Sequence, residues 1–163
     1  MSIKEHIQKI DTLIQAQSTQ LNTLIELLAE ENIALVNRDA DQLQSLNTQK
    51  TDLTQQLEAL TQQQNALLKK LGLDPTQEGL QSFVNKLSGP ILQRVSQHHQ
   101  ALSQALEQCQ QQNNINGQII AANRQSIETA LSVLHGQTPG NKLTYGPSGE
   151  THNTEQGNSL AKA

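Results

Sequence analysis

The sequence predicts an all-α protein: a long antiparallel helical hairpin and a third long helix form a three-helix, coiled-coil-like bundle. First, apolar residues recur at alternating steps of three and four through most of the chain, the spacing of a helical stripe. Second, the longest stripe, Leu92–Leu134, contains no Pro and a single Gly, Gly117. Third, Phe83 and Tyr145 are the only aromatic residues, which favours thin layers of Leu and Ile between helices.

The first helix is expected at residues 3–36. Its apolar stripe is interrupted by polar residues at Gln17 and Glu31, and Glu31 is positioned to meet a cation there. Asn37 and Arg38 end this helix. The apolar members of the stripe are Ile3, Ile7, Ile10, Ile14, Leu21, Leu24, Ile25, Leu28, Ala34 and Leu35.

The second helix is expected at residues 40–71 and has the most regular heptads. Asp39 offers an N-cap, with Gln42 three positions later as in a capping box, and Gly72 follows as a C-cap glycine does. Two long helices separated by about three residues run antiparallel, so their stripes face each other. The second stripe consists of Leu43, Leu46, Leu53, Leu57, Leu60, Leu67 and Leu71, with polar residues at Lys50 and Gln64.

A connector at residues 73–90 contains a short helix, expected at residues 76–88. Ser88-Gly89-Pro90 ends the short helix and starts the third long helix, which Gly136 closes. The short helix carries Leu80, Phe83, Val84 and Leu87 on one side. The third stripe has Leu92, Val95, Leu102, Leu106, Cys109, Ile120, Ile127, Ala130 and Leu134, with polar residues at His99, Asn113, Asn116 and Asn123.

Four residues of low helix propensity, Asn113, Asn114, Asn116 and Gly117, fall close together in the third helix. One interpretation is structural: Gly117 permits a close approach between helices, and the Asn residues fix their register. The other interpretation is a softened segment that bends or opens to admit a partner. The residues alone leave both interpretations open.

The last third of this helix has more apolar residues than one buried stripe needs. If the hairpin leaves them uncovered, they form a docking groove for an amphipathic helix. The alternative is that the short helix at residues 76–88 covers them. The residues concerned are Ile115, Ile119, Ile120, Ile127, Leu131, Val133 and Leu134.

The composition argues against several functions. A net charge of −4 disfavours a nucleic-acid partner, because phosphate binding needs an excess of Lys and Arg. No nucleophile elbow, phosphate-binding loop, dinucleotide motif or paired Cys motif occurs, so we expect no enzyme and no catalytic, cofactor-binding or metal site. His98 and His99 point about 100° apart on a helix and are expected at the surface or on the stripe. Cys109 is expected to be a reduced core residue.

The two ends of the chain suggest where it resides and how it is divided. We find no signal peptide and no apolar run of about 18 residues, so we expect a cytoplasmic protein without direct membrane insertion. After Gly136, only Leu143, Tyr145 and Leu160 are large apolar residues, too few to offset the entropy of ordering. We therefore expect a helical bundle domain at residues 1–136 and a disordered C-terminal tail at residues 137–163.

The order and spacing of several segments match a known pattern. The most specific are Asn113, Asn116-Gly117 and Ile119-Ile120, followed by Leu134, Gly136 and Thr144–Gly149. Earlier segments are Leu24–Glu31, Ala34-Leu35, Asp39–Leu46, Lys50, Leu57 and Leu67–Gly72. In this order they resemble the FlgN family of flagellar type III export chaperones, and the resemblance covers most of the chain.

The resemblance implies an all-helical cytoplasmic chaperone without enzymatic activity. It implies that the protein binds the C-terminal helical regions of hook-associated (hook–filament junction) proteins, prevents their premature assembly and delivers them to the type III export gate and the export ATPase complex. By motif, Tyr145 is the residue expected to dock at the export gate. Together with the surplus apolar surface, the resemblance predicts cargo binding by Ile115, Ile119, Ile120, Ile127, Leu131 and Leu134.

A structural coiled-coil scaffold or tether, which forms homo-oligomers, is the alternative. It explains the heptads equally well, and a homodimer is compatible with either function. It does not explain the capped hairpin or the Tyr145-Gly146 motif.

Overall fold

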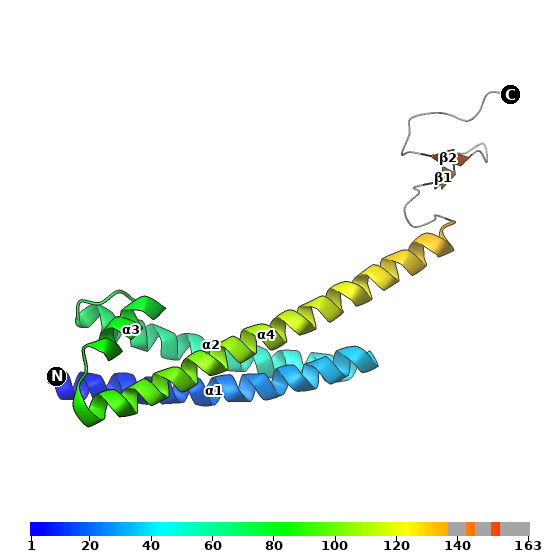
Figure 1. The fold of residues 1–163 in the computed structure, drawn as a ribbon. Helices are drawn as coiled ribbons and strands as arrows, with labels where there is room; N and C mark the ends of the chain where they lie inside the picture. The colour runs from blue at the N-terminus through cyan, green and yellow to red at the C-terminus, as the bar shows by residue number, and fades with distance from the viewer. Residues whose placement is uncertain (137–142, 146–150, 154–163) are drawn as a thin grey trace. The chain divides into compact units, whose positions relative to one another are not determined.

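The computed structural model describes residues 1–136, 143–145 and 151–153, and it confirms the all-helical fold class. The helices within these residues are α1 (Ile3–Asn37), α2 (Ala40–Lys70), α3 (Gln77–Asn85) and α4 (Gly89–Leu134) (Figure 1). The chain divides into two compact units, Met1–Gly117 and Gln118–Ala163. The first unit holds the hairpin, α3 and most of α4.

The ends of α1 and α2 are fixed by local hydrogen bonds. Ser2 and Glu5 form a capping box: the Glu5 N–H donates to Ser2 Oγ at 3.3 Å, and the Ser2 N–H donates to the Glu5 carboxylate at 2.6 Å. Arg38 ends α1 with a φ of 55°, in the left-handed region. The Asp39 carboxylate then accepts from the Gln42 N–H at 3.1 Å, which confirms the predicted cap of α2.

The hairpin of α1 and α2 is antiparallel (Figure 1). The polar residues on the two stripes meet in pairs. Gln64 Nε2 donates to Gln17 Oε1 at 3.2 Å, and Lys50 Nζ lies 2.9 Å from Glu31 Oε2. Gln17 and Glu31 are two heptads apart in α1, as Lys50 and Gln64 are in α2. One register therefore satisfies both pairs, and a one-residue slip would break both.

The main hydrophobic core lies where the start of α1, the end of α2, α3 and the first half of α4 come together. A smaller cluster of Leu27, Ala34, Leu46 and Leu53 lies between α1 and α2 towards the turn of the hairpin. The buried residues of the main core are Ile10, Leu13, Ile14, Leu21, Leu28, Leu67, Leu68, Leu80, Phe83, Val84, Val95, Leu102, Ala105 and Cys109.

Glycine and Thr76 determine several of the helix boundaries. Gly72 and Gly136 have φ values of 72° and 75°, which only glycine adopts readily, and they follow α2 and α4 as predicted. Thr76 caps α3 by accepting from the Gly79 N–H at 3.1 Å. A Cβ at Gly79 would collide with the carbonyl group of Asp74, so the tight start of α3 requires glycine there.

The second unit contains the end of α4 and two short strands. β1 (Leu143–Tyr145) pairs antiparallel with β2 (Thr151–Asn153), with Thr144 opposite His152. These six residues lie in the segment for which the sequence predicts disorder. The rest of residues 137–163 lies outside the described residues, so the predicted disorder there stays a prediction.

Candidate docking face

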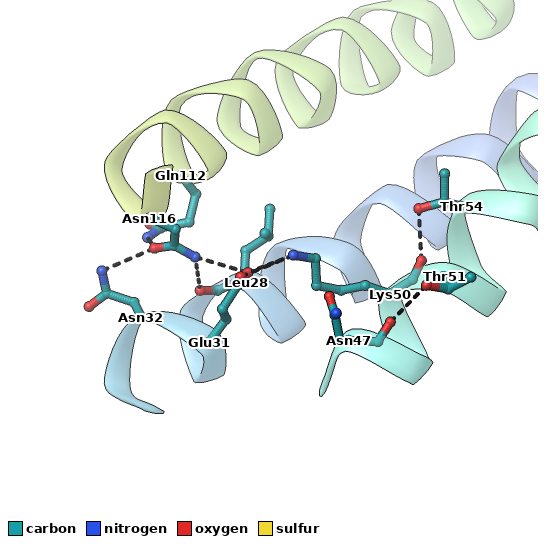
Figure 2. A network of polar contacts seen from close by, with 9 residues as sticks. All are labelled: Leu28, Glu31, Asn32, Asn47, Lys50, Thr51, Thr54, Gln112 and Asn116. Carbon is teal, nitrogen blue, oxygen red and sulfur yellow. Dashed lines mark hydrogen bonds and ion pairs between the residues drawn. The ribbon is translucent and has the colours of Figure 1, made fainter. Parts of the chain in front are cut away.

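A buried amide holds α4 against α1 within the first unit. The side chain of Asn116 is only 1% exposed, and its Nδ2 donates to the backbone carbonyl of Leu28 at 2.8 Å and to Glu31 Oε2 at 3.3 Å. Asn116 Oδ1 accepts from the side-chain amides of Asn32 and Gln112, each at 3.1 Å. Figure 2 shows these contacts converging on one side chain, which fixes α4 along α1 at this point.

Asn116 therefore confirms the structural interpretation of the polar cluster, in which Asn fixes the register of the helices. Asn113 and Asn114 are exposed and do not share this role. The predicted role of Gly117 is wrong, because a Cβ there would meet no atom within 4 Å, so no helix approaches closely. The glycine leaves a weak point in α4 directly after its anchor.

Beyond this anchor, α4 exposes a stripe of large apolar side chains, which we call the docking face. Ile120, Ile127, Leu131 and Leu134 are 49%, 60%, 48% and 81% exposed. At about 100° per residue they fall within an arc of roughly 60° on the helix. They therefore line one side of the helix.

The six predicted cargo-binding residues do not all share this stripe. Ile115 and Ile119 lie on an adjacent flank, on the order of 100° away around the helix. Ile115 is exposed, and Ile119 is half-buried. The docking face is therefore Ile120, Ile127, Leu131 and Leu134, with Ile115 and Ile119 at its side.

The prediction left open whether the short helix covers these residues, and the structure decides this question. α3 buries Leu80, Phe83 and Val84 in the main core with Val95 of α4. Its apolar side is thus used inside the first unit, while the apolar residues of the docking face remain exposed. The apolar side of α3 is therefore not free to cover them.

A second polar cluster joins α1 to α4, and the sequence did not predict it. Asp11 is 4% exposed. Its carboxylate lies 2.7 Å from His98 Nδ1 and 3.2 Å from Arg94 Nε. Asp11 adjoins the stripe instead of lying on it, so the heptad pattern did not reveal its burial. The sequence does contain one clue to this cluster. Arg94 and His98 are four residues apart, so their two basic side chains lie on one face of the helix and can meet a carboxylate there.

His99 and Cys109 both lie on the α4 stripe. His99 is half-buried on the α4 stripe, and desolvation by burial lowers the pKa of its imidazole. Cys109 is buried, its Sγ lies 3.4 Å from the Leu21 carbonyl oxygen, and burial raises the pKa of its thiol. Both placements confirm the predicted stripe positions.

The buried carboxylates among the described residues make contacts between helices. Among the described residues, no group of three or more His, Cys, Asp or Glu side chains is arranged to hold a metal ion. Asp11 and Glu31, the two buried carboxylates among them, are already engaged by cationic partners. None of the helices formed by these residues has the length and hydrophobicity needed to cross a membrane.

These features define a class of protein: an all-helical bundle whose third long helix carries an exposed apolar stripe. A family model described as FlgN protein matches residues 1–153, and the chain therefore belongs to the FlgN family. This confirms the resemblance seen in the sequence.

One solved structure supports the same assignment. It is the 1.48 Å crystal structure of a candidate flagella synthesis protein, FlgN, from Pseudomonas aeruginosa. The two chains are 31% identical, with a TM-score of 0.59, and the match covers 76% of this chain and 93% of that chain. A comparison with curated proteins finds no match.

Proposed function

We propose that this protein is a cytoplasmic flagellar export chaperone that binds the C-terminal helical regions of hook-associated proteins. In this proposal it prevents their premature assembly and delivers them to the type III export gate and the export ATPase complex. Membership in the FlgN family supports a flagellar chaperone role. The observation that carries the proposal is the docking face of Ile120, Ile127, Leu131 and Leu134.

The docking face has the physical properties of a helix-binding surface. Its apolar residues recur at helical spacing, so they match the i, i+4 and i+7 anchors of an amphipathic helix. Burying an exposed Ile or Leu side chain contributes about 1.5–3 kcal/mol. The four residues are already partly covered, so burying what remains exposed contributes several kcal/mol in total, which works against the entropy lost on association.

Other residues have supporting roles in this proposal. Ile115 and Ile119 extend the contact along the flank of the docking face. Tyr145, at the end of β1, docks the loaded chaperone at the export gate. The proposal for Tyr145 is supported by the Tyr145-Gly146 motif and by the family assignment.

The proposal is tested by binding to the C-terminal helical segments of the hook-associated proteins. The variant carries Ile120→Gln and Leu131→Gln, and its helicity is checked by circular dichroism. The matched control carries Ile33→Gln and Val36→Gln, which replace α1 side chains that are also exposed, at 62% and 65%. We expect the first variant to lose at least about tenfold in affinity, which corresponds to about 1.4 kcal/mol, and the control to bind normally.

The outcomes separate the site from the function. If the Ile120 and Leu131 variant stays helical and binds as the wild type does, the site lies elsewhere. A chain ending at Gly136 then shows whether the tail contributes to binding. If the wild-type chain binds no hook-associated segment and forms a stable dimer in solution, the scaffold alternative becomes the better explanation.

A further inference from the structure

The five fully buried polar residues of this bundle follow a rule: each has a polar partner on a different helix. Two half-buried residues, Ser18 and His99, depart from it, since each has one buried side-chain atom without a partner within the described residues. Asp11 pairs with Arg94 and His98, and Asn116 bonds to α1. The same rule holds across the hairpin for Gln17 with Gln64 and for Glu31 with Lys50. An amide or carboxylate buried without a partner would lose its hydrogen bonds to water and gain nothing in return.

Asn123 is the polar residue of the docking face. It follows Asn116 by one heptad on the α4 stripe and lies between Ile120 and Ile127, both exposed. Its own side chain is half-buried, and within residues 1–136 no hydrogen bond to it is seen. A helix docked on Ile120 and Ile127 would cover the Asn123 amide as well.

We propose that Asn123 determines the specificity of the docking face by hydrogen bonding to an uncharged amide or hydroxyl side chain on the docked helix. This inference rests on the proposed function and adds the chemistry of the partner. The occupant is an amphipathic helix whose apolar stripe is interrupted once, by Asn, Gln, Ser or Thr, in register with Asn123. Helices with an unbroken apolar stripe are rejected, because they would leave the Asn123 amide buried and unpaired.

The surroundings of Asn123 favour a neutral partner. The nearest charged residues along the helix, Arg124 and Glu128, pair with each other at 3.2 Å and are 81% and 64% exposed. Arg124 borders the docking face on the edge opposite Asn123, and its charge is already paired with Glu128 in solvent, so it is not placed to compensate a charge buried beside Asn123. The neutral Gln17–Gln64 pair provides the precedent within this chain.

The continuity of the stripe identifies the occupant as a helix. The α4 stripe that places Asn116 against Leu28 and Glu31 of α1 continues at the same spacing through Ile120, Asn123, Ile127 and Leu134. A surface with this spacing packs best against another helix, as its first half does in the bundle.

The test is a double-mutant cycle with the full-length chain and the C-terminal segments of the hook-associated proteins. Asn123→Leu is compared with Asn114→Leu, an exposed position off the stripe of the same helix. In the cargo segment, each Asn, Gln, Ser and Thr on its apolar stripe is replaced by Leu in turn. We expect Asn123→Leu to weaken wild-type cargo about tenfold, one cargo variant to recover this loss, and Asn114→Leu to change nothing.

The other results overturn the inference. Equal affinity of Asn123→Leu and the wild type for every segment would remove any role for Asn123. A loss that no cargo variant recovers would make the residue structural. If Asn123→Leu strengthens self-association while cargo binding is unchanged, the face serves a second copy. If the wild-type chain binds none of the segments, the proposed function itself is rejected. The affinity of the wild-type chain is measured first, before any variant, so this outcome is distinguished from the others.

Discussion

The ammonium group of Lys50 lies 2.9 Å from the carboxylate of Glu31, and this ion pair joins α2 to α1. The same carboxylate accepts a hydrogen bond from Asn116 Nδ2 at 3.3 Å, so it contacts α4 as well (Figure 2). The Glu31 side chain is 11% exposed and the Lys50 side chain 22%. One carboxylate therefore links three helices in the first unit, and its charge depends on Lys50 for compensation.

Replacing Lys50 alone should destabilise the bundle. Lys50→Met leaves the buried Glu31 charge without its cation, and we expect a loss of roughly 2 kcal/mol in the free energy of unfolding. This is less than the about 3–5 kcal/mol of a fully buried pair, because the Lys50 side chain reaches solvent. The double variant Lys50→Met, Glu31→Gln removes both charges, keeps an acceptor for the Asn116 amide and should recover most of the loss. Urea titrations measure both, and an unchanged midpoint for the single variant would show that the pair contributes nothing.

Asn116→Leu should destabilise the bundle by about 1–3 kcal/mol, since it removes the buried amide that bonds α4 to α1. Asn114→Leu is the control, because Asn114 is exposed on the same helix and should stay within about 0.5 kcal/mol of the wild type. Denaturant titration followed by circular dichroism gives both values. Equal stability of the two variants would mean that the contacts of Asn116 do not hold α4 in place.

The sequence predicted the stripes and their polar members because both depend on local periodicity. Gln17, Glu31, Lys50 and Gln64 interrupt otherwise regular heptads, and the short connection between α1 and α2 leaves one antiparallel register that pairs them. The burial of Asp11 was not predicted, because its partners lie on a helix far along the chain and no periodicity links them.

The candidate site was predicted only in part for a similar reason. The number of apolar residues at the end of α4 exceeded what one stripe can bury, and this excess is visible in the sequence. Whether α3 is free to cover these residues depends on where the connector at residues 73–90 returns the chain. Local sequence patterns do not show this, because it depends on the tertiary packing. Gly117 was misinterpreted because a glycine in a helix has the same sequence signature whether a neighbour approaches it or empty space surrounds it.

Two glycines with opposite surroundings should respond oppositely to alanine. Gly117→Ala places a Cβ in open space within α4, so it should stabilise the helix by up to about 1 kcal/mol. Gly79→Ala places the Cβ against the Asp74 carbonyl group at the start of α3 and should be destabilising. Thermal unfolding of the two variants measures the contrast. Destabilisation by Gly117→Ala would mean that the bundle needs the weak point in α4.

Tyr145→Ala should lower export of hook-associated proteins while leaving their affinity for the chaperone unchanged. The reason is that the proposal assigns Tyr145 to the export gate and the docking face to cargo. Export is measured as cargo secreted into the medium, and affinity is measured with purified proteins. Leu143→Ala, in the same strand β1, controls for disturbance of the strand pair. Parallel loss of affinity and export in the Tyr145 variant would move this residue to the cargo site.

The stability of the bundle should fall as the pH is lowered through the range in which His99 titrates. Burial lowers the pKa of His99 below its ordinary value of 6.5 in the folded state. The unfolded chain therefore binds the proton more readily, and the free energy of unfolding rises with pH. The contribution of His99 is complete above about pH 6.5 and is lost as the pH falls from there through the lower pKa of the folded state.

A leucine at this position isolates the effect of His99 from all other titrating groups. His99 Nε2 is buried, and within the described residues it has no hydrogen-bond partner, so His99→Leu also removes an unpaired polar atom from the stripe. The variant should gain stability over the wild type at pH 8 and gain more at pH 5.5, because leucine cannot be protonated. Gln97→Leu, at an exposed position of the same helix, introduces and removes no titrating group and should show no such difference. An equal gain at both pH values for His99→Leu would mean that its imidazole does not titrate differently on folding, and that only the unpaired atom is costly.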